Sequence, residues 1–285
     1  MLVEIEKGKT QRCTALRKLE YLTCGDYVQW QRDKAGSYRV TQQLPRRNVL
    51  TRPNFRGKLR AVAANIDQLV IVIAWRPKPI WDMLDRYLIM AEQLGVQATI
   101  ILNKNDLFLN GEISDKQIKQ AKENLSEYQR IGYSLLTLSL FEKEGLEALK
   151  QQLLAKTSIL AGQSGVGKSS LAQLILPSVK FRIAEISVRG EGRHTTTRST
   201  LYEIAKDSYL IDSPGVRDFP LPSLSERQLA QGYREFQAYS ENCRFNNCLH
   251  DKEPDCAVKK AVIDKEIFTG RYKRYLFQKN NLSPL

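Results

Sequence analysis

The stretch TSILAGQSGVGKSS, residues 157–170, joins a short apolar run to a glycine-rich loop and the start of a polar helix. The loop matches the pattern G-x-x-x-x-G-K-[ST] in full. In such a loop, glycines let backbone N–H groups wrap phosphates, Lys168 can meet the β- and γ-phosphates, and Ser169 can ligate Mg²⁺. The stretch therefore predicts an α/β fold with a phosphate site. The residues expected to contact phosphate are Gly162, Gln163, Ser164, Gly165, Val166, Gly167, Lys168, Ser169 and Ser170.

A second stretch, LNKND at residues 102–106, has the Asn-Lys-x-Asp pattern of a guanine-binding loop. Asp106 can accept both N–H groups of the guanine edge, Asn103 can donate to its N7/O6 side, and Lys104 can lie over the ring. Asn105 completes the element. Adenine has no matching donor pair and would leave the carboxylate unpaired, which disfavours ATP. The alternative is an ordinary polar loop.

Three further segments supply the other elements of a GTP site. DSPG, residues 212–215, matches D-x-x-G, in which Asp212 holds Mg²⁺ through water and the N–H of Gly215 senses the γ-phosphate. SLLTLS supplies Ser139 for the loop that covers the base. GRHTTT, residues 192–197, lies where a switch loop with a metal-binding threonine belongs, and its candidates are Thr195, Thr196 and Thr197.

The order of these elements is unusual, because the base-binding elements precede the phosphate-binding elements. A domain whose ends lie close together can be joined there and opened elsewhere without losing contacts. Strands alternate with helices throughout this part of the chain, as in a parallel sheet with crossover helices. The sequence therefore predicts a circularly permuted P-loop GTPase domain over residues 65–220, which binds GTP and GDP.

The segment before this domain, residues 1–64, is expected to be a small, basic β-barrel. GDYVQW and SYRVTQQL alternate as strands do, with KAG between them as a turn, which favours an OB-type barrel. Residues 1–60 hold 14 Lys and Arg against five Asp and Glu, which is +9 of the net charge of +13. Such an excess attracts a polyanion such as RNA, and we expect Arg46, Arg47 and Lys58 to contribute. The alternative is a solvated basic surface that serves solubility.

The segment after it, residues 221–285, has a helical pattern interrupted by a cysteine-rich loop. Cys243, Cys248, His250 and Cys256 offer three thiolates and one imidazole within fourteen residues. Four protein ligands are the set of a closed tetrahedral zinc site, so we expect one structural zinc ion per chain. The odd total of five cysteines argues against a disulfide framework.

Nothing in the sequence predicts export or membrane insertion. The longest apolar run, LVIVIAW at residues 69–75, is too short to cross a bilayer. The first ten residues contain no apolar stretch of signal-peptide length. We therefore expect a cytoplasmic, monomeric protein without a membrane partner.

The order NKND, GQSGVGKSS, TTT and DSPG, between a basic barrel and a Cys/His cluster, resembles the RsgA (YjeQ) family of bacterial GTPases. LPRRNVLTRP, AANIDQLVIV and LDRYLIMAEQLG also resemble linking segments of that family. The resemblance implies GTP hydrolysis stimulated by the small (30S) ribosomal subunit, contact with its 16S rRNA, and a role in late subunit maturation. It also implies a zinc-binding C-terminal module. The N-terminus is shorter than in the family, so the first barrel strand is expected to be missing or reduced.

The catalytic group is the least determined part of the expected site. Ras-type enzymes place a water-orienting Gln after the glycine of D-x-x-G, but here Val216 follows, and it cannot orient water. His194 is the candidate for this role, and the alternative is a plain surface-loop residue. Two other functions stay open: a GTP-dependent RNA-binding module, and a translation-type GTPase that acts on mature ribosomes.

Overall fold

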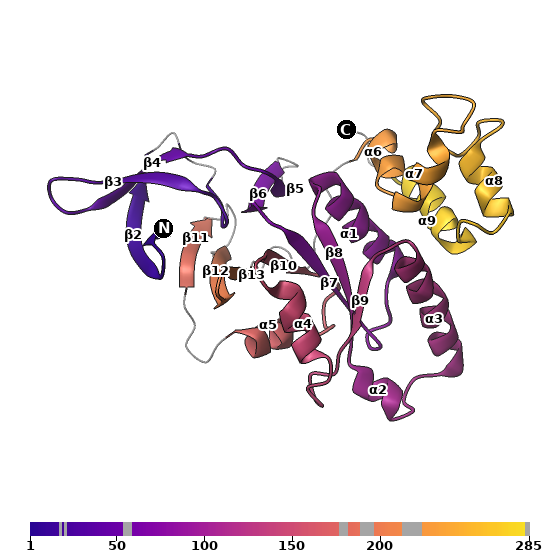
Figure 1. Cartoon of the computed structure of the whole chain (residues 1–285), viewed down its shortest axis with the longest axis horizontal. Coiled ribbons are helices and arrows are strands. Elements are labelled where there is room, and N and C mark those ends of the chain that lie inside the picture. Colours follow the sequence, from indigo (N-terminus) through magenta and orange to yellow (C-terminus); the bar gives the residue numbers. More distant parts are fainter. Residues whose placement is uncertain are drawn as a thin grey trace.

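The computed structural model describes residues 1–16, 19, 22–53, 59–176, 182–188, 197–212 and 224–282, with the backbone alone for residues 53, 182–188, 197 and 198. The chain is elongated, with the N-terminal strands at one end and the C-terminal helices at the other (Figure 1). An α/β unit lies between these two ends.

The α/β unit contains a parallel sheet in the order β13-β10-β7-β8-β9. The strands are β7 (Gln68–Ala74), β8 (Gln97–Asn103), β9 (Ser134–Thr137), β10 (Thr157–Ala161) and β13 (Ser208–Asp212). Two antiparallel strands, β12 (Thr197–Ala205) and β11 (Arg182–Val188), continue the sheet beyond β13. The predicted parallel sheet is confirmed, whereas the antiparallel pair has no counterpart in the sequence prediction.

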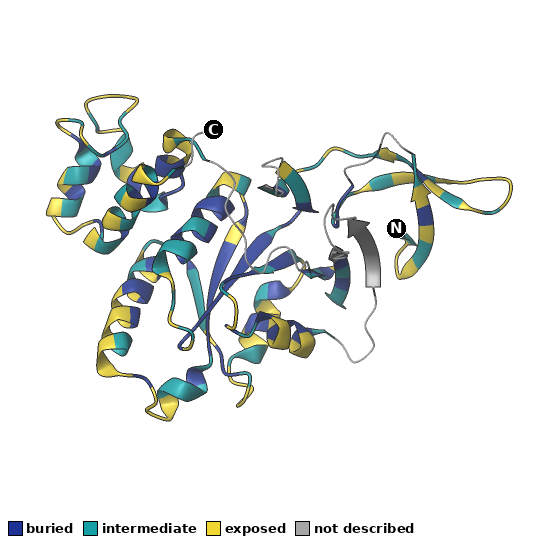
Figure 2. Cartoon of the chain, turned by 180° about the vertical axis from the view of Figure 1, so that it is seen from behind, coloured by how far each residue is buried: buried dark blue, intermediate teal, exposed yellow. Residues whose placement is uncertain are grey.

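Helices cover both faces of this sheet. α1 (Trp81–Leu94) and α3 (Asp115–Arg130) pack on one face, and α4 (Leu146–Leu153) and α5 (Lys168–Ile175) pack on the other. The residues of β7 alternate between the two cores, with Leu69, Ile71 and Ile73 towards α1 and Val70, Val72 and Ala74 towards α4 and α5. All of β7 is buried, as Figure 2 shows in dark blue. Burial on both faces explains its continuous apolar sequence.

The N-terminal strands form a curled sheet that joins the central one. They are β1 (Leu2–Glu6), β2 (Lys9–Ala15), β3 (Val28–Arg32) and β4 (Tyr38–Gln43), paired in the order β3-β4-β2-β1. β1 pairs antiparallel with β11, with Leu2 opposite Glu185. A separate hairpin consists of β5 (Val49–Pro53) and β6 (Leu59–Ala64).

This curled half-barrel fits the expected OB-type barrel in part, with the closure that the short N-terminus had put in question not seen in the described part of the chain. Among the described residues, no ladder of hydrogen bonds closes β1–β6 into a ring. The sheet stays open because the edge of β1 that does not pair with β2 pairs with β11, and not with another N-terminal strand. The two strands predicted around the KAG turn are confirmed as β3 and β4.

The C-terminal part is helical, as the sequence predicts. It consists of α6 (Glu226–Gln231), α7 (Arg234–Ser240), α8 (Ala257–Ile263) and α9 (Thr269–Asn280). Their core contains the stacked rings of Tyr233 and Phe236, with Tyr275 edge-on to both. In the parts of the chain that the structure describes, no helix is long and apolar enough to cross a membrane.

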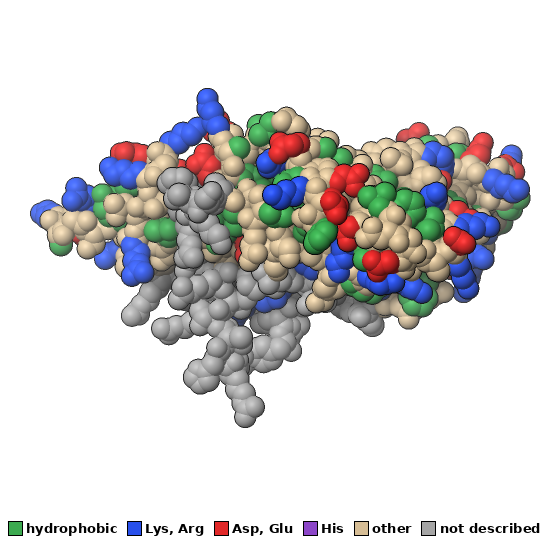
Figure 3. All heavy atoms as spheres, turned by 90° about the horizontal axis from the view of Figure 1, so that it is seen from below, with side chains coloured by type: hydrophobic (Ala, Val, Ile, Leu, Met, Phe, Trp, Pro, Cys, Tyr) green, Lys and Arg blue, Asp and Glu red, His purple; other side chains and the backbone are tan. Residues whose placement is uncertain are grey.

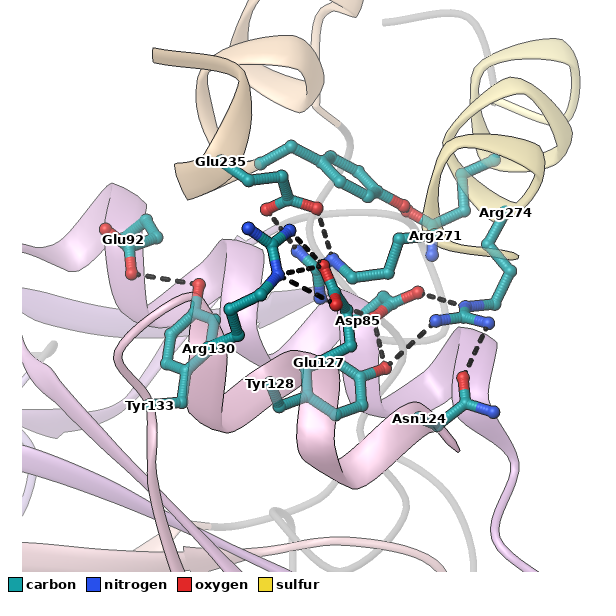
Figure 4. A network of polar contacts seen from close by, with 12 residues as sticks. Asp85, Glu92, Asn124, Glu127, Tyr128, Arg130, Tyr133, Glu235, Arg271 and Arg274 are labelled. Atoms are coloured by element: carbon teal, nitrogen blue, oxygen red, sulfur yellow. Dashed lines mark hydrogen bonds and ion pairs between the residues drawn. The ribbon is translucent and has the colours of Figure 1, made fainter. Parts of the chain in front are cut away.

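A buried ionic network joins these helices to the α/β unit (Figure 4). Arg271 of α9 donates to Asp85 of α1 at 2.7 Å and to Glu235 of α7 at 3.0 Å. The side chains of Arg271 and Asp85 are fully buried. A guanidinium between two carboxylates has its charge compensated, which buried ions require.

The second half of the network reaches α3. Arg274 donates to Asp85 and also to Asn124 and Tyr128. Tyr128 donates its hydroxyl to Asp85. Burial and the neighbouring carboxylate of Asp85 raise the pKa of Tyr128 well above its ordinary value, so the phenol stays a donor. The C-terminal helices therefore dock on α1 and α3.

Replacing Arg271 should expose how much stability depends on this network. Arg271→Leu leaves Asp85 and Glu235 buried without their cation, so the free energy of unfolding should fall by about 3–5 kcal/mol in urea titrations. Lys273→Leu is the matched control, because Lys273 is exposed on the same helix and should change stability by about 0.5 kcal/mol or less. Equal effects of the two substitutions would contradict the importance of the network.

Candidate functional site

The predicted nucleotide residues meet at one edge of the sheet, where the carboxyl ends of β8, β10 and β13 lie. The loop after β10 passes close to its neighbours. A Cβ at Gly162 would lie 2.1 Å from the carbonyl oxygen of Val72, and one at Gly167 would lie 2.4 Å from Nδ2 of Asn103. Both glycines also have positive φ, at 132° and 98°. Glycine is therefore required at these positions by space and by backbone conformation.

Lys168 begins α5 and is 7% exposed. Its Nζ donates to the carbonyl oxygens of Gly162 and Gln163, both at 2.6 Å. The ammonium is thus held inside the curve of the glycine-rich loop. A positive charge in that position, at a helix N-terminus, suits a phosphate group.

The two residues expected to hold Mg²⁺ come together. Ser169 and Asp212 line the same small pocket between α5 and β13, and Lys168 lies beside them. A hydroxyl and a carboxylate are oxygen ligands of the kind that Mg²⁺ prefers. The donor set therefore fits the metal, which would neutralise phosphate charge when bound with the nucleotide.

The NKND loop is fastened to the glycine-rich loop by two hydrogen bonds. Asn103 donates from Nδ2 to the carbonyl oxygen of Val166 at 2.8 Å, and Lys104 donates from Nζ to that of Gly165 at 2.8 Å. Asn103 is 1% exposed, and its Oδ1 has no hydrogen-bond partner among the described residues. The two loops, about 60 residues apart in sequence, therefore form one continuous site.

The loop after β9 forms the other wall of the base region. The hydroxyl of Ser139 donates to Oδ1 of Asp106 at 2.9 Å, and the backbone N–H of Asn105 donates to Leu138 at 2.9 Å. Asn105 also donates from Nδ2 to Glu144 at 3.1 Å. Glu144 is not among the residues predicted from the sequence. Nothing in its spacing marks it, because the contact exists only once the two loops have folded together.

Some predicted residues cannot be compared with the structure. His194, Thr195, Thr196 and Gly215 lie outside the described residues. Thr197 is the first residue of β12, and only its backbone is described. Their roles at the γ-phosphate stay predictions.

The four predicted metal ligands lie together at the C-terminal end of the molecule. The ligand atoms of Cys243, Cys248, His250 and Cys256 all lie within 4.8 Å of one another. The sulfurs of Cys243 and Cys256 are 3.9 Å apart, close to the separation of about 3.8 Å expected for two thiolates on one tetrahedral Zn²⁺. Nδ1 of His250 lies 3.6 Å and 3.5 Å from these two sulfurs. The donor set and its spacing fit a metal ion.

The surroundings of the cluster affect the tautomer and the pKa values of its ligand side chains. Nε2 of His250 lies 3.3 Å from the hydroxyl of Ser240, which leaves Nδ1 for the metal. Burial lowers the pKa of His250, so the imidazole stays neutral, as a ligand must be. Burial raises the pKa of Cys248 to about 12. A bound cation would therefore be needed to hold this sulfur as a thiolate at neutral pH.

Two arginines expected to contribute to the basic N-terminal surface form ion pairs with acidic residues of the same chain. Arg46 pairs with Asp26 at 2.6 Å, and the Asp26 side chain is only 2% exposed. Arg47 pairs with Asp67 at 2.8 Å and donates to the carbonyl of Asn65. The contribution of Arg46 and Arg47 to RNA binding stays a prediction. Lys58 lies outside the described residues.

Comparison with known proteins gives a consistent result for the whole chain. A model of the RsgA GTPase family matches residues 43–222. The small ribosomal subunit biogenesis GTPase RsgA of Chromohalobacter salexigens is 42% identical over 275 residues, which cover 95% of this chain and 79% of that protein. The protein of the same name from Pseudomonas aeruginosa is 40% identical over 274 residues, covering 96% and 79%.

Solved structures agree with the sequence matches. YjeQ from Thermotoga maritima superposes with a TM-score of 0.79 and 29% identity, covering 99% of this chain and 95% of its own. YloQ, described as a circularly permuted GTPase, superposes with a TM-score of 0.74 and 29% identity, covering 100% and 91%. The predicted circular permutation therefore agrees with the description of this solved structure.

Metal analysis should find about one zinc ion per chain, lost when Cys243 or Cys256 is replaced by Ser. Because metal binding of this kind is coupled to folding, the loss should make the segment 224–282 sensitive to limited proteolysis. Cys13→Ser is the matched control, because Cys13 is a buried free cysteine of the N-terminal sheet and should leave the metal content unchanged. A metal-free protein with a protease-resistant C-terminal segment would refute the site.

Proposed function

The chain belongs to the RsgA GTPase family and is a GTP-hydrolysing enzyme, and from that premise we propose that it acts in biogenesis of the small ribosomal subunit. In this proposal it binds the maturing 30S particle, contacts 16S rRNA, and hydrolyses GTP to GDP and phosphate in response to the subunit. The relatives that carry this function in their names match nearly the whole chain. The observation that supports a guanine-nucleotide site is the pair of hydrogen bonds from Asn103 and Lys104 to the glycine-rich loop.

Selection of guanine is assigned to the NKND loop. Asp106 accepts the N1–H and 2-amino protons of guanine, and Asn103 donates its remaining amide proton to the N7/O6 side. Adenine would leave the carboxylate of Asp106 without hydrogen-bond donors. The desolvation free energy of that carboxylate would then be uncompensated, which weakens adenine binding. This role is supported by the hydroxyl of Ser139, which already fixes one oxygen of Asp106.

Phosphate binding and charge stabilisation are assigned to the loop after β10. Lys168 and the backbone N–H groups of that loop meet the phosphates, and Ser169 with Asp212 would hold Mg²⁺. Thr195, Thr196 and Thr197 and the N–H of Gly215 are assigned to the γ-phosphate. His194 is the proposed water-orienting group, because Val216 cannot serve; the alternative is a surface-loop residue.

Contact with RNA is assigned to the outer face of the sheet β2-β4-β3, which we call the basic sheet face. Thr14 pairs with Arg39 across the strands, and Arg39 pairs with Gln31, so these side chains share one face with Arg12. All four residues are exposed, whereas Cys13 and Val40 on the opposite face are buried. Figure 3 shows several Lys and Arg side chains at this end of the molecule (left), as well as others at the opposite end. An exposed, polar and positive sheet face suits a phosphate backbone.

In the proposed organisation of the chain, residues 1–64 contact RNA, residues 65–220 bind GTP and residues 221–285 hold one structural zinc ion. The protein is proposed to act as a monomer in the cytoplasm, where subunits assemble. The competing functions are a GTP-dependent RNA-binding module and a GTPase of mature ribosomes.

A hydrolysis assay separates these functions. GTP turnover should rise at least about tenfold with purified small subunits and should not rise with large subunits or free rRNA. Lys168→Ala should abolish the turnover, because the ammonium that stabilises phosphate charge is lost. Stimulation by free rRNA alone would favour the RNA-binding module, and stimulation only by whole ribosomes would favour the translation-type function.

Reversing charge on the basic sheet face should weaken subunit binding. Arg12→Glu with Arg39→Glu should lower affinity and reduce the slope of log affinity against log salt by about 1–2, because two phosphate contacts are lost. The matched control is Lys116→Glu with Lys119→Glu, two exposed lysines on α3. If the slope is unchanged in the first variant, the RNA contact lies on another surface, such as that of α9.

A further inference from the structure

Two loops of the base region are held together by three hydrogen bonds between residues 105–106 and residues 138–144. One is a backbone bond from Asn105 to Leu138 at 2.9 Å, and one joins the hydroxyl of Ser139 to Asp106 at 2.9 Å. The third is a side-chain bond from Nδ2 of Asn105 to Oε2 of Glu144 at 3.1 Å. The first two involve groups already assigned to the base site. The third involves a carboxylate with no assigned role.

Glu144 is held at a fixed place in its loop. Ser139 and Glu144 form an antiparallel bridge, with the N–H of Ser139 donating to the Glu144 carbonyl at 3.3 Å. Gly145 follows with φ of 73°, and a Cβ there would lie 2.3 Å from the carbonyl oxygen of Thr137. Only glycine fits this close turn, so the backbone fixes the position of the Glu144 side chain relative to Ser139.

The NKND loop needs such support, because its turn is conformationally unfavourable. Lys104 has φ of 61° and ψ of 42°, the left-handed region that non-glycine residues rarely adopt. A residue in that conformation persists only when contacts on both sides hold it. On one side, Lys104 Nζ donates to Gly165. On the other side, the buried amide of Asn105 donates to Glu144.

We propose that Glu144, acting through Asn105, is a positioning residue that sets the orientation of Asp106 towards the guanine edge. Asn105 and Asp106 are consecutive residues at the start of α2 (Asn105–Leu109). A bond that fixes the amide of Asn105 therefore fixes the direction in which the next side chain projects. This inference rests on the guanine-nucleotide site proposed above, and it adds a specificity-determining residue to that site.

The expected effect is moderate and selective. A hydrogen bond to a carboxylate is stronger than a neutral one, but Glu144 is exposed to solvent, which limits the expected loss of GDP binding to about tenfold. Inosine diphosphate lacks the 2-amino group and uses only the N1–H donor. A misdirected Asp106 should therefore weaken GDP binding more than IDP binding. A general loosening of the fold would weaken both equally.

The test measures the affinity of the full-length protein for GDP, IDP and ADP by displacement of a fluorescent guanine nucleotide. Glu144→Ala should lose about tenfold for GDP and less than about threefold for IDP, with an unchanged melting temperature. Glu144→Gln keeps an acceptor oxygen and should restore GDP affinity to within about threefold of the unmodified protein. The matched control is Glu147→Ala, which removes an exposed carboxylate that pairs with Lys150, and it should bind GDP normally.

A double-mutant cycle completes the test. In an Asn105→Ala background, Glu144→Ala should have little further effect on GDP affinity, because the two residues act through one contact. A normal GDP affinity of Glu144→Ala, or equal losses for GDP and IDP, would overturn the positioning role while leaving the GTPase proposal intact. Equal affinity of the unmodified protein for ADP and GDP would instead overturn the guanine site itself, and the role of Glu144 with it.

Discussion

The constraint on which the site depends is the position of β7 between the strands that carry its two halves. The phosphate loop follows β10 and the base loop follows β8, and β7 pairs with both in parallel register. Because β7 is buried on both faces, neither neighbour can shift without breaking two apolar cores. The close approach of Gly162 to Val72 brings the glycine-rich loop onto this strand. Hydrogen bonds from Asn103 and Lys104 then join the base loop to the glycine-rich loop across the end of β7.

Much of this arrangement is predictable from local sequence. The glycine-rich loop, the NKND loop and the Cys/His cluster each carry their chemistry within a few residues, so the family and the grouping of the described site residues could be predicted. The continuous apolar run of β7 likewise indicates a strand buried on both faces. Local sequence does not indicate which strands or side chains pair when they lie far apart in the chain. The pairing of β1 with β11, and of Arg46 with Asp26, depends on edges and cavities that exist only in the folded chain.

The two outer parts of the molecule attach to different halves of the nucleotide site. The loop that carries the Cys/His cluster is bonded to α9, because Tyr272 donates to the carbonyl of His250 at 2.8 Å. α9 is in turn bonded to α1, with Gln278 donating to Asp82 at 2.9 Å. The N-terminal strands instead join β11, beside β12 and β13, whose far end is Asp212. The helices around the Cys/His cluster are therefore connected to the base-binding half, and the N-terminal strands to the phosphate-binding half.

The buried network also has a consequence for how the protein is made. Asp85 and Arg271 lie 186 residues apart, so α1 leaves the translating ribosome long before the helix that neutralises its buried carboxylate. Until α9 is synthesised, the surface of α1 and α3 that it covers stays open, with Asp85, Asn124 and Tyr128 in water. Asp85 thus gains its buried partner only when α9 has been synthesised. A chain that lacks α9 would display this uncovered surface to cellular proteases.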